Sequence, residues 1–122
     1  MPRTRLPRCT CGRLAHPDAR AARMAAARGT RQSDSPNIRC VPYTCPDGHH
    51  HTMLWPTSGL VLSCRCGCPA LSHLRDADVL LAYLRRKHPE AVNPYVMYRC
   101  TTGGVHIARD KAVPADAQKA AA

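Results

Sequence analysis

A helical period of apolar residues stands out in the second half of the chain. The stripe is spaced i, i+3, i+4 and i+7 and consists of Ala77, Leu80, Leu81 and Leu84. This spacing places the four side chains on one face and predicts an amphipathic helix. Ser72 or Asp76 can cap its start, and the helix is expected to end near His88-Pro89, because proline does not continue a helix.

The first half contains a helix-forming segment of different composition. Residues 17–28 are rich in alanine, with Asp18 placed to complement the helix dipole, and Gly29 is the expected stop. The positions that match the apolar stripe of the second helix are all small: Ala22, Ala25, Ala26 and Gly29. The second helix should therefore bury more apolar surface, so the second half of the chain should be the better folded.

Each helix is followed by two short segments that are typical of a β-hairpin. The four segments are 38–45 and 49–55 in the first half and 95–100 and 105–109 in the second. Since side chains alternate along a strand, Cys45 and His51 are expected to face each other across the first hairpin, with Gly48 at its tip. A further short strand is expected at 60–63.

Cysteine and histidine recur in the two halves at a fixed offset of 55 residues. The segments that begin at Tyr43 and Tyr98 both read Tyr-x-Cys-x-x-Gly-x-x-His, and a Cys-x-Cys-Gly precedes each of them. The cysteine, glycine, tyrosine and histidine residues of these motifs align without a gap at seven pairs of positions, which are 9/64, 11/66, 12/67, 43/98, 45/100, 48/103 and 51/106. We interpret this pattern as an internal duplication.

The duplication predicts a small α+β fold made of two tandem zinc-stapled units, each a metal-holding turn, a helix and a β-hairpin. Residues 1–55 form the first unit with a basic N-terminal arm, 56–59 the linker, 60–110 the second unit, and 111–122 a frayed Ala-rich tail. Units of about fifty residues bury little apolar surface, so a metal staple is expected in each of them.

Three thiolates and one imidazole form a closed tetrahedral site for Zn²⁺. The repeat supplies two such sets and predicts two zinc ions per chain. The ligands of the first are Cys9, Cys11, Cys45 and His51, and those of the second are Cys64, Cys66, Cys100 and His106. Disulfides are the main alternative, and a redox thiol pair is a second one that leaves the histidines unexplained.

Some ligand assignments stay open at this point. His49, His50 and His51 compete in the first copy; the offset favours His51, His50 fits after a one-residue shift, and His49 is expected to be solvated. Cys68 competes with Cys64 and Cys66 in the second copy. Cys40 and Cys68 have no cysteine partner in the repeat, so we expect small buried hydrophobic residues or spare thiols there.

The net charge of +10 suggests a polyanionic partner, although a basic surface can also serve solubility alone. The candidate contacts to nucleic acid lie on the two helices and are Arg20, Arg23, Arg28, Arg85, Arg86 and Lys87. There is no apolar run long enough for a membrane span and no apolar signal core after the basic N-terminus, so we expect a reducing, cytoplasmic location without membrane contact.

The pattern resembles small zinc-ribbon-like proteins of actinobacteria and their phages, which carry Cys-x-Cys-Gly-Lys, an Ala-rich helix, Tyr-x-Cys and Trp-His-Leu-Thr. The matching segments of this chain begin at Cys9, Tyr43, Cys64 and Tyr98. The chain departs from that pattern at the Lys, where it has Arg13 and Cys68, and at the Trp, where it has His50 and Val105. The resemblance implies zinc binding and a phage or mobile-element setting, hence a bacterial host cytoplasm.

These observations favour a non-enzymatic zinc-binding protein that contacts nucleic acid, DNA or RNA, with weak sequence preference, as an accessory or regulatory factor. A zinc-stapled adaptor that binds another protein is the alternative. A metal-dependent nuclease is the remote one, because catalytic zinc keeps an open coordination position and a Cys3His set closes it. The sequence does not fix an oligomeric state.

Overall fold

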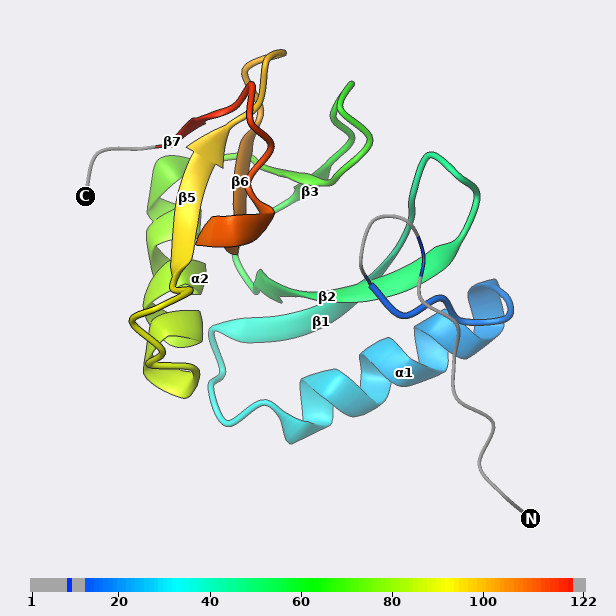
Figure 1. Cartoon of the computed structure of the whole chain (residues 1–122). Coiled ribbons are helices and arrows are strands. Elements are labelled where there is room, and N and C mark those ends of the chain that lie inside the picture. Colours follow the sequence, from blue (N-terminus) through cyan, green and yellow to red (C-terminus); the bar gives the residue numbers. More distant parts are fainter. Residues whose placement is uncertain (1–8, 10–12, 120–122) are drawn as a thin grey trace. The chain divides into compact units, whose positions relative to one another are not determined.

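The structure, a computed structural model, describes residues 9 and 13–119. In chain order the helices and strands of these residues are α1 (Ala19–Gln32), β1 (Ile38–Thr44), β2 (His50–Pro56), β3 (Val61–Leu62), β4 (Ala70–Leu71), α2 (Leu74–Lys87), β5 (Tyr95–Arg99), β6 (Val105–Arg109), the 3-10 helix η1 (Asp110–Ala112) and β7 (Gln118–Lys119) (Figure 1). The predicted small α+β fold is confirmed. The chain divides into two compact units, 1–54 and 55–122.

The duplication extends from the sequence to the backbone. Both α1 and α2 have 14 residues, and their first residues, Ala19 and Leu74, are 55 positions apart. The isolated β-bridge between His16 and His50 recurs 55 residues later as the pairing of Leu71 with Val105. Each unit therefore contains the same order of turn, helix and hairpin.

In the first unit, α1 packs against the hairpin formed by β1 and β2. Asp18 is the N-cap of α1 and accepts a hydrogen bond of 2.7 Å from the backbone N–H of Ala21. The helix does not stop at Gly29 but continues to Gln32. Gly29 instead permits a close approach of helix and strand, because a Cβ there would lie 2.8 Å from the Cβ of Cys40.

In the second unit, the strands form a sheet in the order β3-β4-β6-β5-β7, and α2 packs on β4, β5 and β6. The buried residues of α2 include Leu80, Tyr83 and Leu84, whereas those of α1 are Ala22 and Ala26. The expectation that the second helix buries the larger side chains is thus met. The N-cap of α2 is His73, and its side chain makes no capping hydrogen bond.

Residues 56–59 do not behave as a free linker. Pro56 and Gly59 are buried, and the N–H of Gly59 donates to the carbonyl of Pro56. The hydroxyl of Ser58 donates to the carboxylate of Asp76, 2.7 Å away, which ties this turn to the first turn of α2. Trp55, also buried, donates its indole N–H to the carbonyl of Leu60. The segment is thus part of the second unit.

The expected frayed tail is wrong for residues 111–119. The chain forms η1 and then β7, in which Lys119 pairs with Tyr98 and Gln118 with Arg99. An ion pair of 2.6 Å between Lys119 and Asp110 closes this loop. No sign of β7 was present in the sequence, because a strand of only two residues shows no alternation of apolar and polar positions. Residues 120–122 lie outside the described residues.

Candidate metal centres

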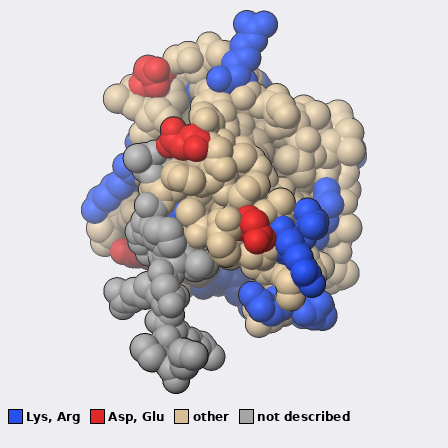
Figure 2. All heavy atoms as spheres, turned by 90° about the vertical axis from the view of Figure 1, so that its right-hand side faces the viewer, with Lys and Arg blue, Asp and Glu red and all other residues tan. Residues whose placement is uncertain are grey.

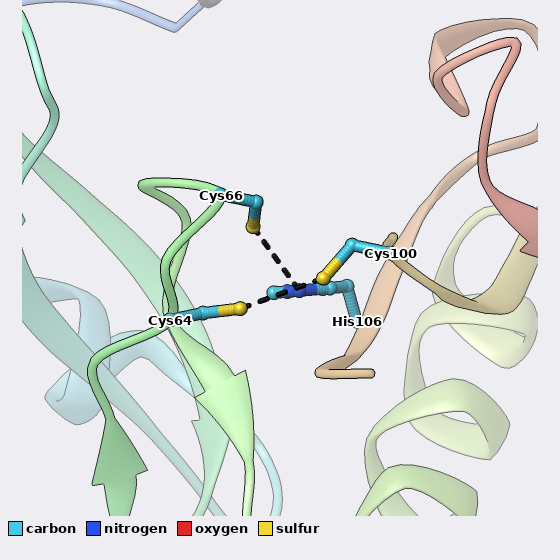
Figure 3. A group of neighbouring side chains, drawn as sticks. All are labelled: Cys64, Cys66, Cys100 and His106. Carbon is cyan, nitrogen blue, oxygen red and sulfur yellow. Dashed lines mark hydrogen bonds between the residues drawn. The ribbon is translucent and has the colours of Figure 1, made fainter. Parts of the chain in front are cut away.

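In the second unit the structure brings together the four side chains that the repeat selects. The ligand atoms of Cys64, Cys66, Cys100 and His106 all lie within 4.8 Å of one another (Figure 3). The sulfurs of Cys64 and Cys100 are 3.5 Å apart, and Nε2 of His106 is 3.3 Å from the sulfur of Cys66. Ligands of a tetrahedral zinc ion are separated by about 3.5–3.8 Å, given Zn–S and Zn–N bonds of about 2.3 and 2.0 Å. The cluster, which we call the second centre, is therefore of the right size.

Two tight turns place the three thiols of the second centre. The N–H of Gly67 donates to the carbonyl of Cys64, and the N–H of Gly103 donates to that of Cys100, each at 2.9 Å. Both glycines have φ near +90°, a conformation that side chains with a Cβ rarely adopt. The backbone therefore requires glycine at the third position after Cys64 and after Cys100.

The imidazole of His106 is held in one orientation. Its Nδ1 lies 2.8 Å from the carbonyl oxygen of Pro69, so Nδ1 carries the proton and Nε2 presents its lone pair to the thiols. The ring stacks on Tyr98 with a centroid distance of 5.2 Å. In the register of the hairpin His106 pairs with Tyr98, while Cys100 lies across from Gly104. The backbone N–H of Cys45 likewise donates to the carbonyl of His49, so the expectation that Cys45 faces His51 across the first hairpin is wrong by two residues, because the turn is centred on Asp47 and not on Gly48.

The thiols of the second centre differ in acidity. A hydrogen bond from Thr102 is the main reason that the pKa of Cys100 falls to about 5, while burial raises the pKa of Cys66 to about 12. Burial opposes ionisation of Cys64 as well, yet the hydroxyl of Thr102 and a backbone N–H leave its pKa below the ordinary value. Zinc binds thiolates, so the ionised Cys100 is ready to receive it.

The first centre, in the first unit, is assembled differently. The ligand atoms of Cys9, Cys45, Asp47 and His49 lie within 4.8 Å of one another. The two sulfurs are 3.6 Å apart, and Nδ1 of His49 is 2.9 Å from the sulfur of Cys9. The hydrogen bond with Cys9 raises the pKa of His49. His49, expected to be solvated, is thus exposed but in contact with a predicted ligand.

The structure repeats the supporting contacts of His106 at His51. Nδ1 of His51 is 2.8 Å from the carbonyl of Leu14, and its ring lies 5.3 Å from that of Tyr43. Leu14 and Tyr43 correspond to Pro69 and Tyr98 at the offset of 55. His51 is fully buried, as a shielded ligand would be. Its assignment as a ligand stays a prediction.

The remaining candidate ligands lie apart from the two clusters or cannot be placed. Cys11 is outside the described residues. His50 lies outside the first cluster, and its ring is 3.4 Å from the hydroxyl of Thr44. Cys68 is exposed and is not in the second cluster. All seven cysteines among the described residues are free thiols, which counts against the disulfide alternative for them.

Sequence reasoning missed Asp47 as a member of the first cluster and placed His49 behind His51 and His50. A signal was present, since the motif Cys-x-Asp-x-His from Cys45 to His49 offers three metal-binding side chains within one turn. Reliance on the repeat discounted it, because the corresponding residues of the second copy are Thr102 and Gly104.

The candidate nucleic-acid contacts fall into two groups. Arg20, Arg23 and Arg28 are exposed on α1, a helix without acidic residues, and none of them forms an ion pair with a described residue. On α2 the basic side chains are engaged: Arg85 donates to the carbonyl of Tyr95, and Arg86 lies over the ring of Tyr83. Basic side chains project from the surface in several places, whereas acidic ones are sparse (Figure 2).

Comparison with protein families, characterised proteins and solved structures found no match. The fold and the two clusters define a small α+β protein in which each unit can hold a metal ion. Among the described residues, no helix is long and apolar enough to cross a membrane.

Proposed function

We propose that this chain is a zinc-binding protein with one ion in each unit, and that its biological role is to contact nucleic acid as an accessory or regulatory factor. The observation that carries the metal proposal is the convergence of three thiols and one oriented imidazole at the second centre. Such a closed set favours a structural role for the ion over catalysis, because it leaves no coordination position for a substrate.

A bound zinc ion would supply stability that the small hydrophobic core of each unit does not provide. Each unit is small, and the largest buried side chains of α1 are alanines. An ion joined to the turn and the hairpin would fix both relative to the helix between them. Protein purified without chelator should therefore contain close to two zinc ions per chain by elemental analysis. A zinc content near zero, in protein that is nonetheless folded, contradicts the metal proposal.

The nucleic-acid proposal is supported by the arginines of α1. With an angle of about 100° per residue, Arg20, Arg23, Arg28 and Arg31 lie on one face, opposite the buried Ala22 and Ala26. An exposed helix face that carries arginine and no acid suits a phosphate backbone. It offers no aromatic platform for bases, so binding should depend little on base sequence.

Salt dependence tests this proposal. Affinity for duplex DNA, single-stranded DNA or RNA should fall steeply with salt, with a slope of about −0.9 per phosphate contacted on duplex DNA. Replacing Arg20, Arg23 and Arg28 with Gln should flatten that slope, because glutamine keeps the helix but releases no counterions. Replacing Arg85 and Arg86 with Gln is the matched control and should change the slope less.

The outcome also decides between the two binding roles. If none of the three nucleic acids binds at low salt while two zinc ions are present, the nucleic-acid proposal fails. The protein-interaction adaptor then becomes the better account.

A further inference from the structure

The two centres differ at the one position that lies over their sulfur atoms. In the second centre this position is Gly104, where a Cβ would be 2.6 Å from the sulfur of Cys64 and 3.0 Å from Nε2 of His106. At the offset of 55 the first unit has His49 in place of Gly104 and Cys9 in place of Cys64. Nδ1 of His49 is 2.9 Å from the sulfur of Cys9. The first centre thus has an imidazole beside the sulfur of Cys9 at a sequence position where the second centre has no side chain.

A second difference lies two residues earlier. In the second centre Thr102 places a hydroxyl 3.4 Å from the sulfur of Cys64 and 3.1 Å from that of Cys100. In the first centre this residue is Asp47, whose Oδ2 is 3.9 Å from the sulfur of Cys9. A hydroxyl supports thiolates by donating hydrogen bonds, whereas a carboxylate is itself a ligand for divalent metals.

We propose that His49 is a metal ligand of the first centre through Nδ1, and that this centre binds late first-row divalent ions, such as Ni²⁺ and Co²⁺, with more than four protein ligands. The inference rests on the proposed function, in that it requires the first centre to bind a metal. It adds that the two centres differ in coordination number and in the ions they accept.

The contact of His49 with a thiol is as close as that of the predicted histidine ligand in the second centre. Nδ1 of His49 is 2.9 Å from the sulfur of Cys9, and Nε2 of His106 is 3.3 Å from the sulfur of Cys66. The imidazole of His49 therefore lies within reach of an ion bound by Cys9.

The donor atoms support the same conclusion. The four clustered donors of the first centre are two thiolates, the imidazole of His49 and the carboxylate of Asp47. The imidazole of His51, which lies outside this cluster, is the fifth donor that the repeat predicts. Imidazole suits nickel and copper as well as zinc, whereas a thiolate-rich tetrahedral set selects zinc. Asp47 and His49 are exposed while Cys9 and Cys45 are buried, so the additional ligands lie on the solvent side, where an ion enters.

Cadmium-113 NMR of the full chain with ¹⁵N-labelled histidine tests the proposal directly, because a ligand nitrogen is coupled to the metal nucleus and a hydrogen-bonded one is not. We expect two cadmium signals, and coupling of Nδ1 of His49 to one of them. His49→Ala should shift that signal toward the position of a sulfur-rich site and leave the second unchanged. His50→Ala is the matched control, since His50 is outside the cluster, and it should move neither signal.

Nickel affinity provides an independent measurement. His49→Ala should weaken nickel binding at the first centre by at least about tenfold, the lower end of the effect of a supporting residue, and His50→Ala should not. Two cadmium ions without coupling to His49, or equal nickel affinity in both variants, would overturn this inference and leave the zinc proposal intact. Absence of any bound ion would overturn both.

Discussion

At the scale of single residues, Thr102 lowers the pKa of Cys100 in the second centre. Its hydroxyl is 3.1 Å from the sulfur of Cys100 and is the main reason that the pKa of this thiol falls to about 5. A thiol with a lowered pKa contributes stability in full above its ordinary pKa and loses it as the pH falls through the lowered one. Cys100 should therefore keep its contribution to ion binding down to pH values near its lowered pKa of about 5, whereas the raised pKa of Cys66, about 12, works against ion binding.

Thr102→Val should raise the pH at which the second centre releases zinc. The lost hydrogen bond is worth about 0.5–1.5 kcal/mol, which corresponds to about 0.4–1 pH unit at about 1.36 kcal/mol per unit. A pH titration of zinc release, followed with a chromogenic chelator, measures the midpoint. Thr101→Val is the control, because Thr101 is exposed and is not a member of the cluster. Equal midpoints in the two variants would show that Thr102 does not set the acidity.

The spacing of the cysteines and histidines was enough to predict which side chains meet in the second centre, because the same spacing occurs in both copies of the motif. It was not enough at the first centre. There the turn from Cys45 to His49 places His49 in the cluster, and the second copy has glycine at the matching position. A repeat identifies the residues that two copies share, so it cannot predict the role of a residue such as His49 that only one copy has.

At the scale of elements, the buried carboxylate of Asp76 anchors the start of α2. It lies in the first turn of the helix, where the dipole favours an anion, and it accepts a hydrogen bond of 2.7 Å from Ser58. Asp76 and Ser58 thus stabilise the start of the helix, where the N-cap residue His73 makes no capping hydrogen bond.

Ser58→Ala should destabilise the second unit by about 1–3 kcal/mol, because it removes a hydrogen bond from a buried carboxylate. Chemical denaturation of the zinc-loaded protein, monitored by amide exchange in α2, measures the effect. Ser63→Ala serves as the control, since Ser63 is exposed. An unchanged exchange rate in α2 would mean that the contact contributes nothing to its stability.

Helices and hairpins followed from periodicity and turn residues, and their bounds were close to those observed. The missed elements share a physical reason. β4, β7 and η1 have two or three residues each, too few to show a period. β7 pairs with a strand about twenty residues away in sequence, Tyr98 with Lys119, so its structure depends on a tertiary contact that local composition cannot reveal.

At the scale of the whole molecule, the two units should differ in stability. α2 buries Leu80, Tyr83 and Leu84, and α1 buries Ala22 and Ala26. At about 25 cal/mol per Å² of buried apolar area, the larger side chains contribute more. The second unit should therefore be the more stable of the two.

Two serine variants test this asymmetry. Cys45→Ser should unfold the first unit and leave the second folded. Cys100→Ser should remove the ion from the better-packed unit and leave the chain largely unfolded, since the first unit is weak by itself. Amide exchange resolved by residue distinguishes the units in each variant. Equal loss of protection in both variants would contradict the expected difference.

Because the side chain of Cys40 packs against Gly29, the reactivity of its thiol should depend on whether α1 is docked on β1. The sulfur of Cys40 lies 2.9 Å from the place where a Cβ of Gly29 would be, so α1 covers one side of a residue that is otherwise partly exposed. Burial also raises the pKa of Cys40, which keeps the thiol in its unreactive form. Labelling of Cys40 should therefore be slower while α1 is docked on β1 than after the helix lifts from the hairpin. Measured with and without metal, the labelling rate reports on the stability of the first unit without an introduced cysteine.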